Sequence, residues 1–160
     1  MQYPDKSILN EIHLFFKKEQ LVLSVVESCS GGLIASLITD IPGASGFFDS
    51  GIVAYSNESK TNLVSVKSTT LIKQGVISEE TARQMAEGMR RLRKTDYSLS
   101  ITGNLGPSAL EEKDIGLAYF AVSSQDGTVS KEMRFTGTRK RIKKLAAWHA
   151  LNFLHQVLPL

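Results

Sequence analysis

One short segment of the sequence places a serine between an apolar stretch and a pair of glycines. Ser28 follows the apolar residues 21–26 and precedes Gly31 and Gly32, after which an apolar pattern resumes. Glycines let a backbone approach a ligand closely, and amides at a helix start can hold an anion or an oxyanion. We therefore predict that Ser28 is a nucleophile and that the amides of residues 30–32 hold the oxyanion. A serine that only caps the helix is the alternative.

A serine nucleophile needs a base, and the sequence offers a lysine rather than a histidine. Lys60 ends the stretch Tyr-Ser-Asn-Glu-Ser-Lys at 55–60, directly after a predicted strand. Ser–Lys pairs are an attested alternative to the Ser-His-Asp triad. To accept a proton near neutral pH, Lys60 needs a pKa lowered from ~10.4 to about 7–8, and burial beside Tyr55 could lower it. The alternative is an exposed helix lysine paired with Glu58 or with solvent.

Other loop residues offer weaker chemistry. Ser45 lies in a turn-rich loop, where a plain turn role is the alternative. Thr102 and Gly103 close another predicted strand, so the Thr102 hydroxyl reaches the same sheet edge as Ser28 if the strands are parallel. A turn or cap hydroxyl is the alternative for Thr102. Glu27 and Asp40 could form a glycosidase-like carboxylate pair, but nothing in the sequence pairs them.

The sequence offers no cluster of metal ligands. Its single cysteine, Cys29, excludes an intrachain disulfide and a cysteine-rich zinc site, and agrees with a reducing compartment. The histidines, His13, His149 and His155, are far apart, and the spacing of the last two does not place them on one helical face. We expect neither a metal nor a cofactor.

The elements that must position these residues can be read from apolar periodicity and turn signals. A buried strand, a glycine-rich turn and a helix surround Ser28, and Asp126-Gly127 predicts a hairpin. The expected helices cover residues 7–18, 33–38, from 78 to the basic cluster at 90–94, and 138–157, with a short one from 56 that carries Lys60. The expected strands cover residues 21–26, 47–55, 97–101, 117–123 and 129–135. This order predicts one α/β domain over residues 1–160: three layers, with a mixed sheet between helices on both faces.

Positive charge is concentrated in residues 90–94 and 139–144, within a net charge of +3. Such runs can bind phosphate or nucleic acid, but more often form solvated helix faces and C-terminal turns. No aromatic residue interleaves with either run, so nucleic-acid binding is not expected. No apolar run is long enough to span a membrane, and no signal peptide is apparent after Met1. We expect a cytoplasmic protein.

Taken together, these segments resemble the CinA C-terminal domain family, the nicotinamide-nucleotide amidases. The resemblance extends over nearly the whole chain, in family order and at family spacing. Its motifs are Glu-Ser-Cys-Ser-Gly-Gly at 27–32, Pro-Gly-Ala-Ser at 42–45, Tyr-Ser-Asn-Glu-Ser-Lys at 55–60, Gly-Val-Ile-Ser-Glu-Glu at 75–80, and Thr-Gly at 102–103 with Gly-Pro at 106–107. The resemblance implies hydrolysis of nicotinamide mononucleotide to nicotinic acid mononucleotide and ammonia. It also implies a homo-oligomer, and we expect a stand-alone version of the domain.

The resemblance assigns roles by position. Ser28 matches the motif serine, Lys60 the lysine that ends the Tyr-Ser-Asn-Glu motif, and Tyr55 the tyrosine that opens it. Ser45 matches a hydroxyl residue of the Pro-Gly loop and stays a second candidate for the nucleophile. The expected catalytic residues are thus Ser28, Lys60, Tyr55 and Ser45. The expected substrate contacts are Ser30, Gly31, Gly32, Asn57, Thr102, Gly103, Arg139 and Lys143.

The chain departs from the family pattern around the expected substrate. Ser30 replaces a threonine, and Asn104-Leu105 replaces Ile/Val-Ala. Residues 108–112 are bulkier and more acidic than the usual Gly-Gly, and Lys143 stands where an arginine is usual. Two alternatives to an amidase therefore stay open. They are a non-catalytic nucleotide-binding module and a partner protein in competence or DNA damage.

Overall fold

The computed structural model describes residues 7–160, and within them five strands form one mixed sheet. The sheet order is β2-β1-β3-β4-β5, with β1 parallel to β2 and β3, β4 antiparallel to β3, and β5 antiparallel to β4. The predicted hairpin at Asp126-Gly127 is confirmed as the turn between β4 and β5. The strands are β1 Leu23–Glu27, β2 Phe48–Val53, β3 Tyr97–Gly103, β4 Leu117–Ser124 and β5 Gly127–Arg134.

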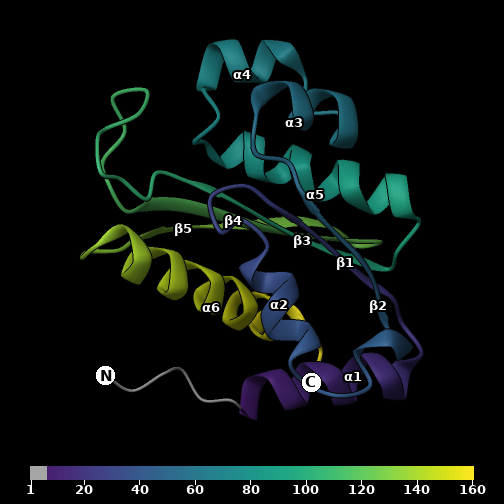
Figure 1. The fold of residues 1–160 in the computed structure, drawn as a ribbon. Coiled ribbons are helices and arrows are strands. Elements are labelled where there is room, and N and C mark those ends of the chain that lie inside the picture. Colours follow the sequence, from purple (N-terminus) through teal and green to yellow (C-terminus); the bar gives the residue numbers. More distant parts are fainter. Residues whose placement is uncertain (1–6) are drawn as a thin grey trace.

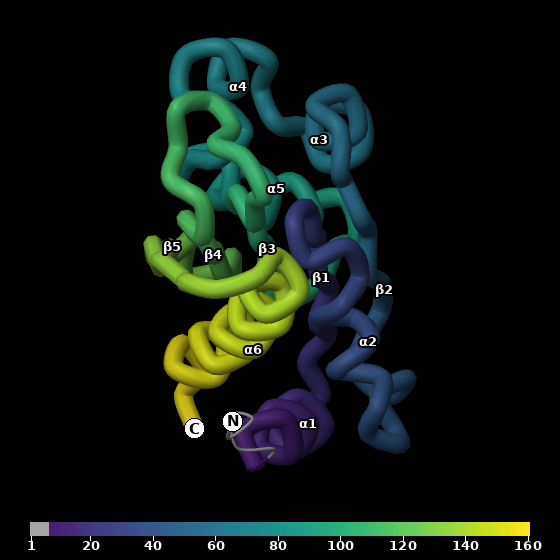
Figure 2. The backbone as a smooth tube through the Cα atoms, turned by 60° about the vertical axis from the view of Figure 1, so that its left-hand side comes forward, coloured from purple at the N-terminus to yellow at the C-terminus, as the bar shows by residue number. Residues whose placement is uncertain are grey.

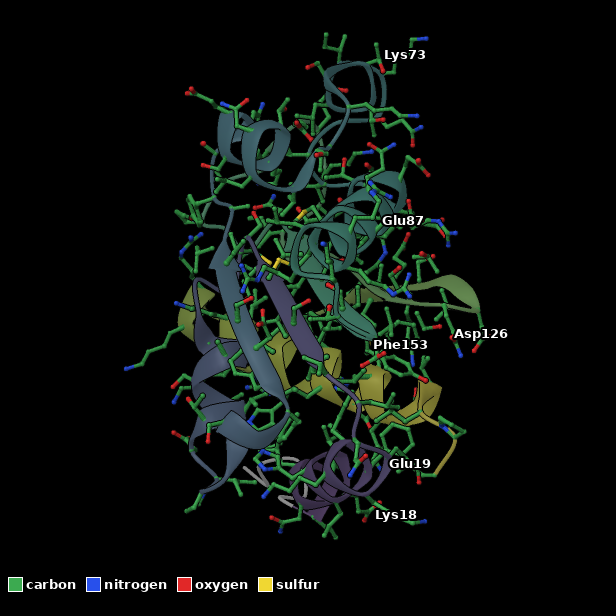
Figure 3. The ribbon with its side chains drawn as sticks, turned by 90° about the vertical axis from the view of Figure 1, so that its right-hand side faces the viewer. Lys18, Glu19, Lys73, Glu87, Asp126 and Phe153 are labelled. Carbon is green, nitrogen blue, oxygen red and sulfur yellow. The ribbon has the colours of Figure 1, made fainter. Side chains whose placement is uncertain are left out.

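Helices cover both faces of the sheet, so the predicted three-layer α/β architecture is confirmed (Figure 1). One layer is formed by α1 Ser7–Glu19, α2 Leu33–Thr39 and α6 Arg139–Val157. The other layer is formed by α3 Asn57–Val64, α4 Ser68–Gln74 and α5 Glu79–Arg93. Here α5 contacts β3 and β4, while α3 and α4 pack on α5 (Figure 2). Lys73 of α4 and Lys18 of α1 therefore lie at opposite ends of the molecule (Figure 3).

The interior strand β1 is buried on both faces, as its nearly continuous apolar run predicted. Val25 belongs to the larger core, which the sheet forms with α1, α2 and α6. Val26 points to the other face and packs with Met85 and Met89 of α5. Because successive side chains of a strand face opposite ways, these two cores fix the orientation of β1 up to Ser28.

One basic run lies at the C-terminus of a helix and the other at the N-terminus of a helix. Residues 90–93 occupy the last turns of α5, where cations complement the helix dipole, as expected. Residues 139–144 instead open α6 at its N-terminus, where no acidic side chain accompanies them. The expected solvated helix face is confirmed for this second run, since Arg139, Lys140, Arg141 and Lys144 are exposed, but the run lies at the N-terminus of its helix and not in a C-terminal turn. Positive charge at a helix N-terminus is opposed by the helix dipole. The dipole therefore does not explain these cations, and we look for their role in the surface that the start of α6 faces.

Two local expectations need correction. The strand predicted for residues 47–55 ends at Val53, so Ala54 and Tyr55 lie in the connection to α3. The helix α4 was not predicted, because its seven residues contain a single buried side chain, Thr70, and so show no apolar periodicity. Among residues 7–160, no helix has the length and apolar character needed to cross a membrane.

Candidate active site

Ser28 and Lys60 lie in contact at the carboxyl ends of two adjacent parallel strands. Ser28 directly follows β1, and Lys60 lies in the first turns of α3, which follows β2. The Nζ of Lys60 donates a hydrogen bond of 2.9 Å to the Oγ of Ser28. Ser28 is 8% exposed and Lys60 only 1%. The lysine is therefore not the exposed, solvent-paired residue of the alternative interpretation.

The buried Lys60 is held by backbone carbonyls rather than by a carboxylate. Its Nζ donates to the carbonyl oxygens of Ala54, at 2.9 Å, and Tyr55, at 3.1 Å. In the part of the chain that the structure describes, no acidic side chain forms a salt bridge with it. Burial lowers the pKa of Lys60 to about 8, because removal from water disfavours the ammonium; Cys29 and Glu111 act in the opposite direction.

A buried carboxylate organises the loop after Ser28. Glu27 is 1% exposed, and its Oε2 accepts from the Ser30 hydroxyl at 2.6 Å and from the amides of Gly32 and Ile34, both at 3.0 Å. Its Oε1 accepts from the amide of Ala35 at 2.9 Å. Glu27 thus fills the start of α2, which leaves no room for a substrate anion at that helix end.

The expected oxyanion donors therefore need revision. The Gly32 amide is bound to Glu27, and the Gly31 amide donates to the carbonyl of Ser28 at 3.1 Å. Within residues 7–160, the amides of Cys29 and Ser30 donate to no backbone carbonyl. These two are the donors that remain available beside the Ser28 hydroxyl.

A cleft of about 200 Å³ opens onto the Ser28–Lys60 pair. Thr102 and Gly103, at the end of β3, line it as expected from parallel pairing with β1. The Thr102 hydroxyl donates to the carbonyl of Val76 at 2.7 Å, so toward a ligand it acts as an acceptor. The residues lining the cleft are Ser28, Cys29, Tyr55, Lys60, Val76, Ile77, Thr102, Gly103, Asn104, Leu105, Gly106, Ser108, Leu110 and Arg139.

Two cations from the start of α6 lie near the Ser28–Lys60 pair, and one of them, Arg139, lines the cleft. Arg139 donates to the hydroxyl of Tyr55 at 3.1 Å and to the carbonyl of Gly106. The Nζ of Lys143 lies beside the loop that follows Ser28, since a Cβ added to Gly31 would come within 3.2 Å of it. The basic run of α6 therefore faces the cleft through Arg139.

Two expected site residues lie elsewhere. Ser45 is exposed in η1 Ala44–Gly46, which precedes β2, so it lies at the end of the sheet opposite to Ser28. Asn57 is the exposed first residue of α3 and does not line the cleft. The structure brings neither of them to the Ser28–Lys60 pair.

Sequence reasoning missed two acidic residues that shape the site. Glu27 was considered only as half of a carboxylate pair with Asp40, but Asp40 is exposed at the far end of α2. Its position directly before Ser28 was the available signal. Glu111 was considered only as added bulk and charge, yet its carboxylate binds the amides of Val76 and Ile77 beside the cleft.

Comparison with known proteins gives consistent matches over the whole chain. Residues 5–158 match the sequence profile of the CinA C-terminal domain. A competence-damage inducible protein of Thermoanaerobacter pseudethanolicus is 39% identical over 156 residues, which cover 96% of this chain and 38% of that protein. A CinA-like protein of Endomicrobium trichonymphae is 45% identical over 137 residues, which cover 85% of this chain and 32% of that protein. The chain thus spans less than two fifths of these relatives.

Solved structures share the fold at close to full length. A CinA superfamily protein of Escherichia coli superposes with a TM-score of 0.93 at 28% identity, covering 99% of this chain and 95% of that one. A competence/damage inducible protein of Agrobacterium tumefaciens superposes with a TM-score of 0.90 at 33% identity, covering 96% of each chain.

Proposed function

Because the chain belongs to the CinA C-terminal domain family, we propose that it hydrolyses the carboxamide of nicotinamide mononucleotide. The products are nicotinic acid mononucleotide and ammonia, and the reaction passes through an acyl-enzyme on Ser28. One observation carries this proposal. The buried amine of Lys60 lies 2.9 Å from the Ser28 hydroxyl, and no carboxylate of residues 7–160 is in ion-pair contact with it.

The carbonyls around Lys60 orient its lone pair. A neutral amine has two N–H groups, and these match the carbonyl oxygens of Ala54 and Tyr55. The lone pair is then left for the hydroxyl hydrogen of Ser28. Ser28 attacks the carboxamide carbon while Lys60 takes this proton, so the nucleophile is activated without histidine.

The amides of Cys29 and Ser30 supply the remaining catalytic donors. They are available beside Ser28 and can stabilise the oxyanion of the tetrahedral intermediate. When this intermediate collapses, the Lys60 ammonium returns its proton to the leaving ammonia. A water molecule then attacks the acyl ester, with Lys60 again as base, and releases the carboxylic acid and free Ser28.

The cleft has the polarity that this substrate needs. Val76, Ile77 and Leu105 supply apolar walls for a pyridine ring. Arg139 and Lys143 supply positive charge for the phosphate at the mouth, and Glu27 keeps that phosphate away from the start of α2. We include a homo-oligomer and a cytoplasmic location in the proposal, on family resemblance and a single buried cysteine.

The test is ammonia release from nicotinamide mononucleotide by the full chain, with the Ser28→Ala variant as the control. A covalent adduct on Ser28, found by mass spectrometry after acid quenching, supports the acyl-enzyme. If the Ser28→Ala variant still releases ammonia, Ser28 is not the nucleophile.

A second candidate rests on the basic start of α6 and on the relatives named for competence and damage. In this alternative the domain binds a nucleotide or DNA without turnover. Nucleotide binding without ammonia release favours a non-catalytic module, and a salt-dependent shift of DNA in gels favours the nucleic-acid partner.

A further inference from the structure

The loop between β3 and β4 crosses toward the helical layer of α4 (Figures 1 and 2). It turns at Glu111 and Glu112, which have φ values of +53° and +58°. Leu110 and Lys113 flank this turn and pair as an isolated bridge, with the Lys113 amide donating to the Leu110 carbonyl at 2.9 Å. Two successive left-handed residues make a tight turn of the type I′ kind, which fixes the direction of the side chains at its corner.

The Glu111 side chain reaches from this turn to the segment before α5. Its Oε1 accepts from the Val76 amide at 3.0 Å, and its Oε2 accepts from the Ile77 amide at 3.3 Å. Gly75 has a φ of +84°, and a Cβ at this position would collide with the Glu111 carboxylate. The segment 75–77 is therefore shaped to receive that carboxylate.

The residues that Glu111 joins are walls of the same cleft. Val76 and Ile77 line it on the side of α5, and Leu110 lines it from the loop. The contact thus joins two segments that line the cleft of Ser28 and Lys60, through Val76 and Ile77 on one side and Leu110, the neighbour of Glu111, on the other. The acid neighbouring Glu111 in the turn, Glu112, makes no hydrogen bond within the described residues.

We propose that Glu111 is a positioning residue that selects substrates by size. By binding the amides of Val76 and Ile77 it holds Leu110 as a fixed wall across the cleft. The cleft volume of about 200 Å³ lies below the ~300 Å³ at which pockets for drug-sized ligands begin, so the cleft has room for a carboxamide ring and larger attached groups must pass Leu110. The identity of the substrate in this inference rests on the proposed amidase function.

The first test compares Glu111→Gln with Glu112→Gln, which removes the same charge from the same turn. A glutamine at 111 presents an NH₂ group to one of the two amides and breaks the paired contact. We expect hydrogen exchange of the Val76 and Ile77 amides, followed by NMR, to accelerate about tenfold in Glu111→Gln only. Unchanged exchange, or equal acceleration in Glu112→Gln, overturns the contact.

The second test uses two substrates with the same carboxamide, nicotinamide mononucleotide and the larger NAD⁺. We expect Glu111→Gln to reduce the preference in kcat/KM for the smaller substrate roughly tenfold, through KM for NAD⁺ rather than through kcat. Leu110→Ala should reduce the preference equally, with no change in exchange at Val76 and Ile77. An unchanged preference in both variants overturns the role in selection.

The two proposals can fail separately. If the wild type releases ammonia from neither compound, the amidase function fails. The size selection is then decided by the affinities of both compounds for the wild type and Glu111→Gln, measured by calorimetry. If the wild type binds nicotinamide mononucleotide more tightly than NAD⁺ and Glu111→Gln reduces this difference in affinity, the role of Glu111 is supported. An equal reduction in Glu112→Gln contradicts it.

Discussion

The Nζ of Lys60 and the Oγ of Ser28 lie 2.9 Å apart although 32 positions separate the two residues in the sequence. A single inter-strand contact sets this distance. The amide of Ala54 donates to the carbonyl of Glu27 at 2.8 Å, and the carbonyl of Ala54 accepts from Lys60. The register of β2 on β1 therefore determines whether Lys60 reaches Ser28.

Removal of either member of the pair should abolish hydrolysis. We expect Ser28→Ala and Lys60→Met each to lower kcat at least about 10³-fold, because a nucleophile and its base act as one unit. Methionine keeps the length of the buried side chain without the amine. Ammonia release is the measurement, and circular dichroism checks the fold.

The matched control for this prediction is Ser45→Ala. Ser45 lies at the opposite end of the sheet, so we expect unchanged turnover. If Ser45→Ala is inactive and Ser28→Ala is active, the nucleophile has been assigned to the wrong loop.

The rate should rise with pH as Lys60 loses its proton. Burial lowers the pKa of this residue to about 8, and only the neutral amine accepts the serine proton. We expect kcat/KM to increase through an apparent pKa near 8 and then level off. Lys60→Arg should be inactive at every pH, because arginine keeps its proton in proteins. A flat wild-type profile from pH 6 to 9, or an active arginine variant, would show that Lys60 acts only as a charge.

The same shift in pKa predicts how stability depends on pH. The unfolded chain keeps the ordinary lysine pKa of ~10.4, so between about 8 and that value it binds a proton that the folded protein does not. Stability therefore rises with pH in this window. We expect the free energy of unfolding of the wild type to gain about 3 kcal/mol relative to Lys60→Met across it. Urea titrations at several pH values measure this difference, and a constant difference is evidence against a neutral buried lysine.

Glu27→Gln should destabilise the fold by about 2–4 kcal/mol, because an amide cannot accept all four hydrogen bonds of the buried carboxylate. Glu58→Gln serves as the control, since Glu58 is exposed in the first turn of α3. Thermal unfolding of the three proteins measures the effect. A midpoint for Glu27→Gln equal to that of Glu58→Gln would mean that Glu27 does not hold the start of α2.

The position of the Ser28–Lys60 pair was predictable from the sequence. Each residue closely follows a short strand, and parallel neighbouring strands bring their carboxyl ends to one edge. The mixed sheet was predictable because Asp126-Gly127 is a strong local turn signal. Both predictions depend on backbone direction, which local patterns determine well.

The contacts that individual side chains make could not be predicted in the same way. A loop hydroxyl such as Ser45 looks the same at either end of a strand, so the sequence could not assign it to an edge. Nothing in Glu111-Glu112 indicates two successive left-handed residues, because that conformation ordinarily favours glycine or asparagine. Likewise, the occupation of the α2 amides by Glu27 depends on a side-chain rotamer within a packed core.

The position of β2 at the edge of the sheet has a consequence for how the activity responds to heating. Within the described sheet β2 pairs with β1, while β1 is enclosed between β2 and β3. Segments at an edge open locally at a lower free energy than the centre of a sheet. Ser28 follows the interior strand β1, whereas the carbonyls that anchor Lys60 follow the edge strand β2. Heating should therefore separate the base from an otherwise native molecule, and inactivation should precede global melting.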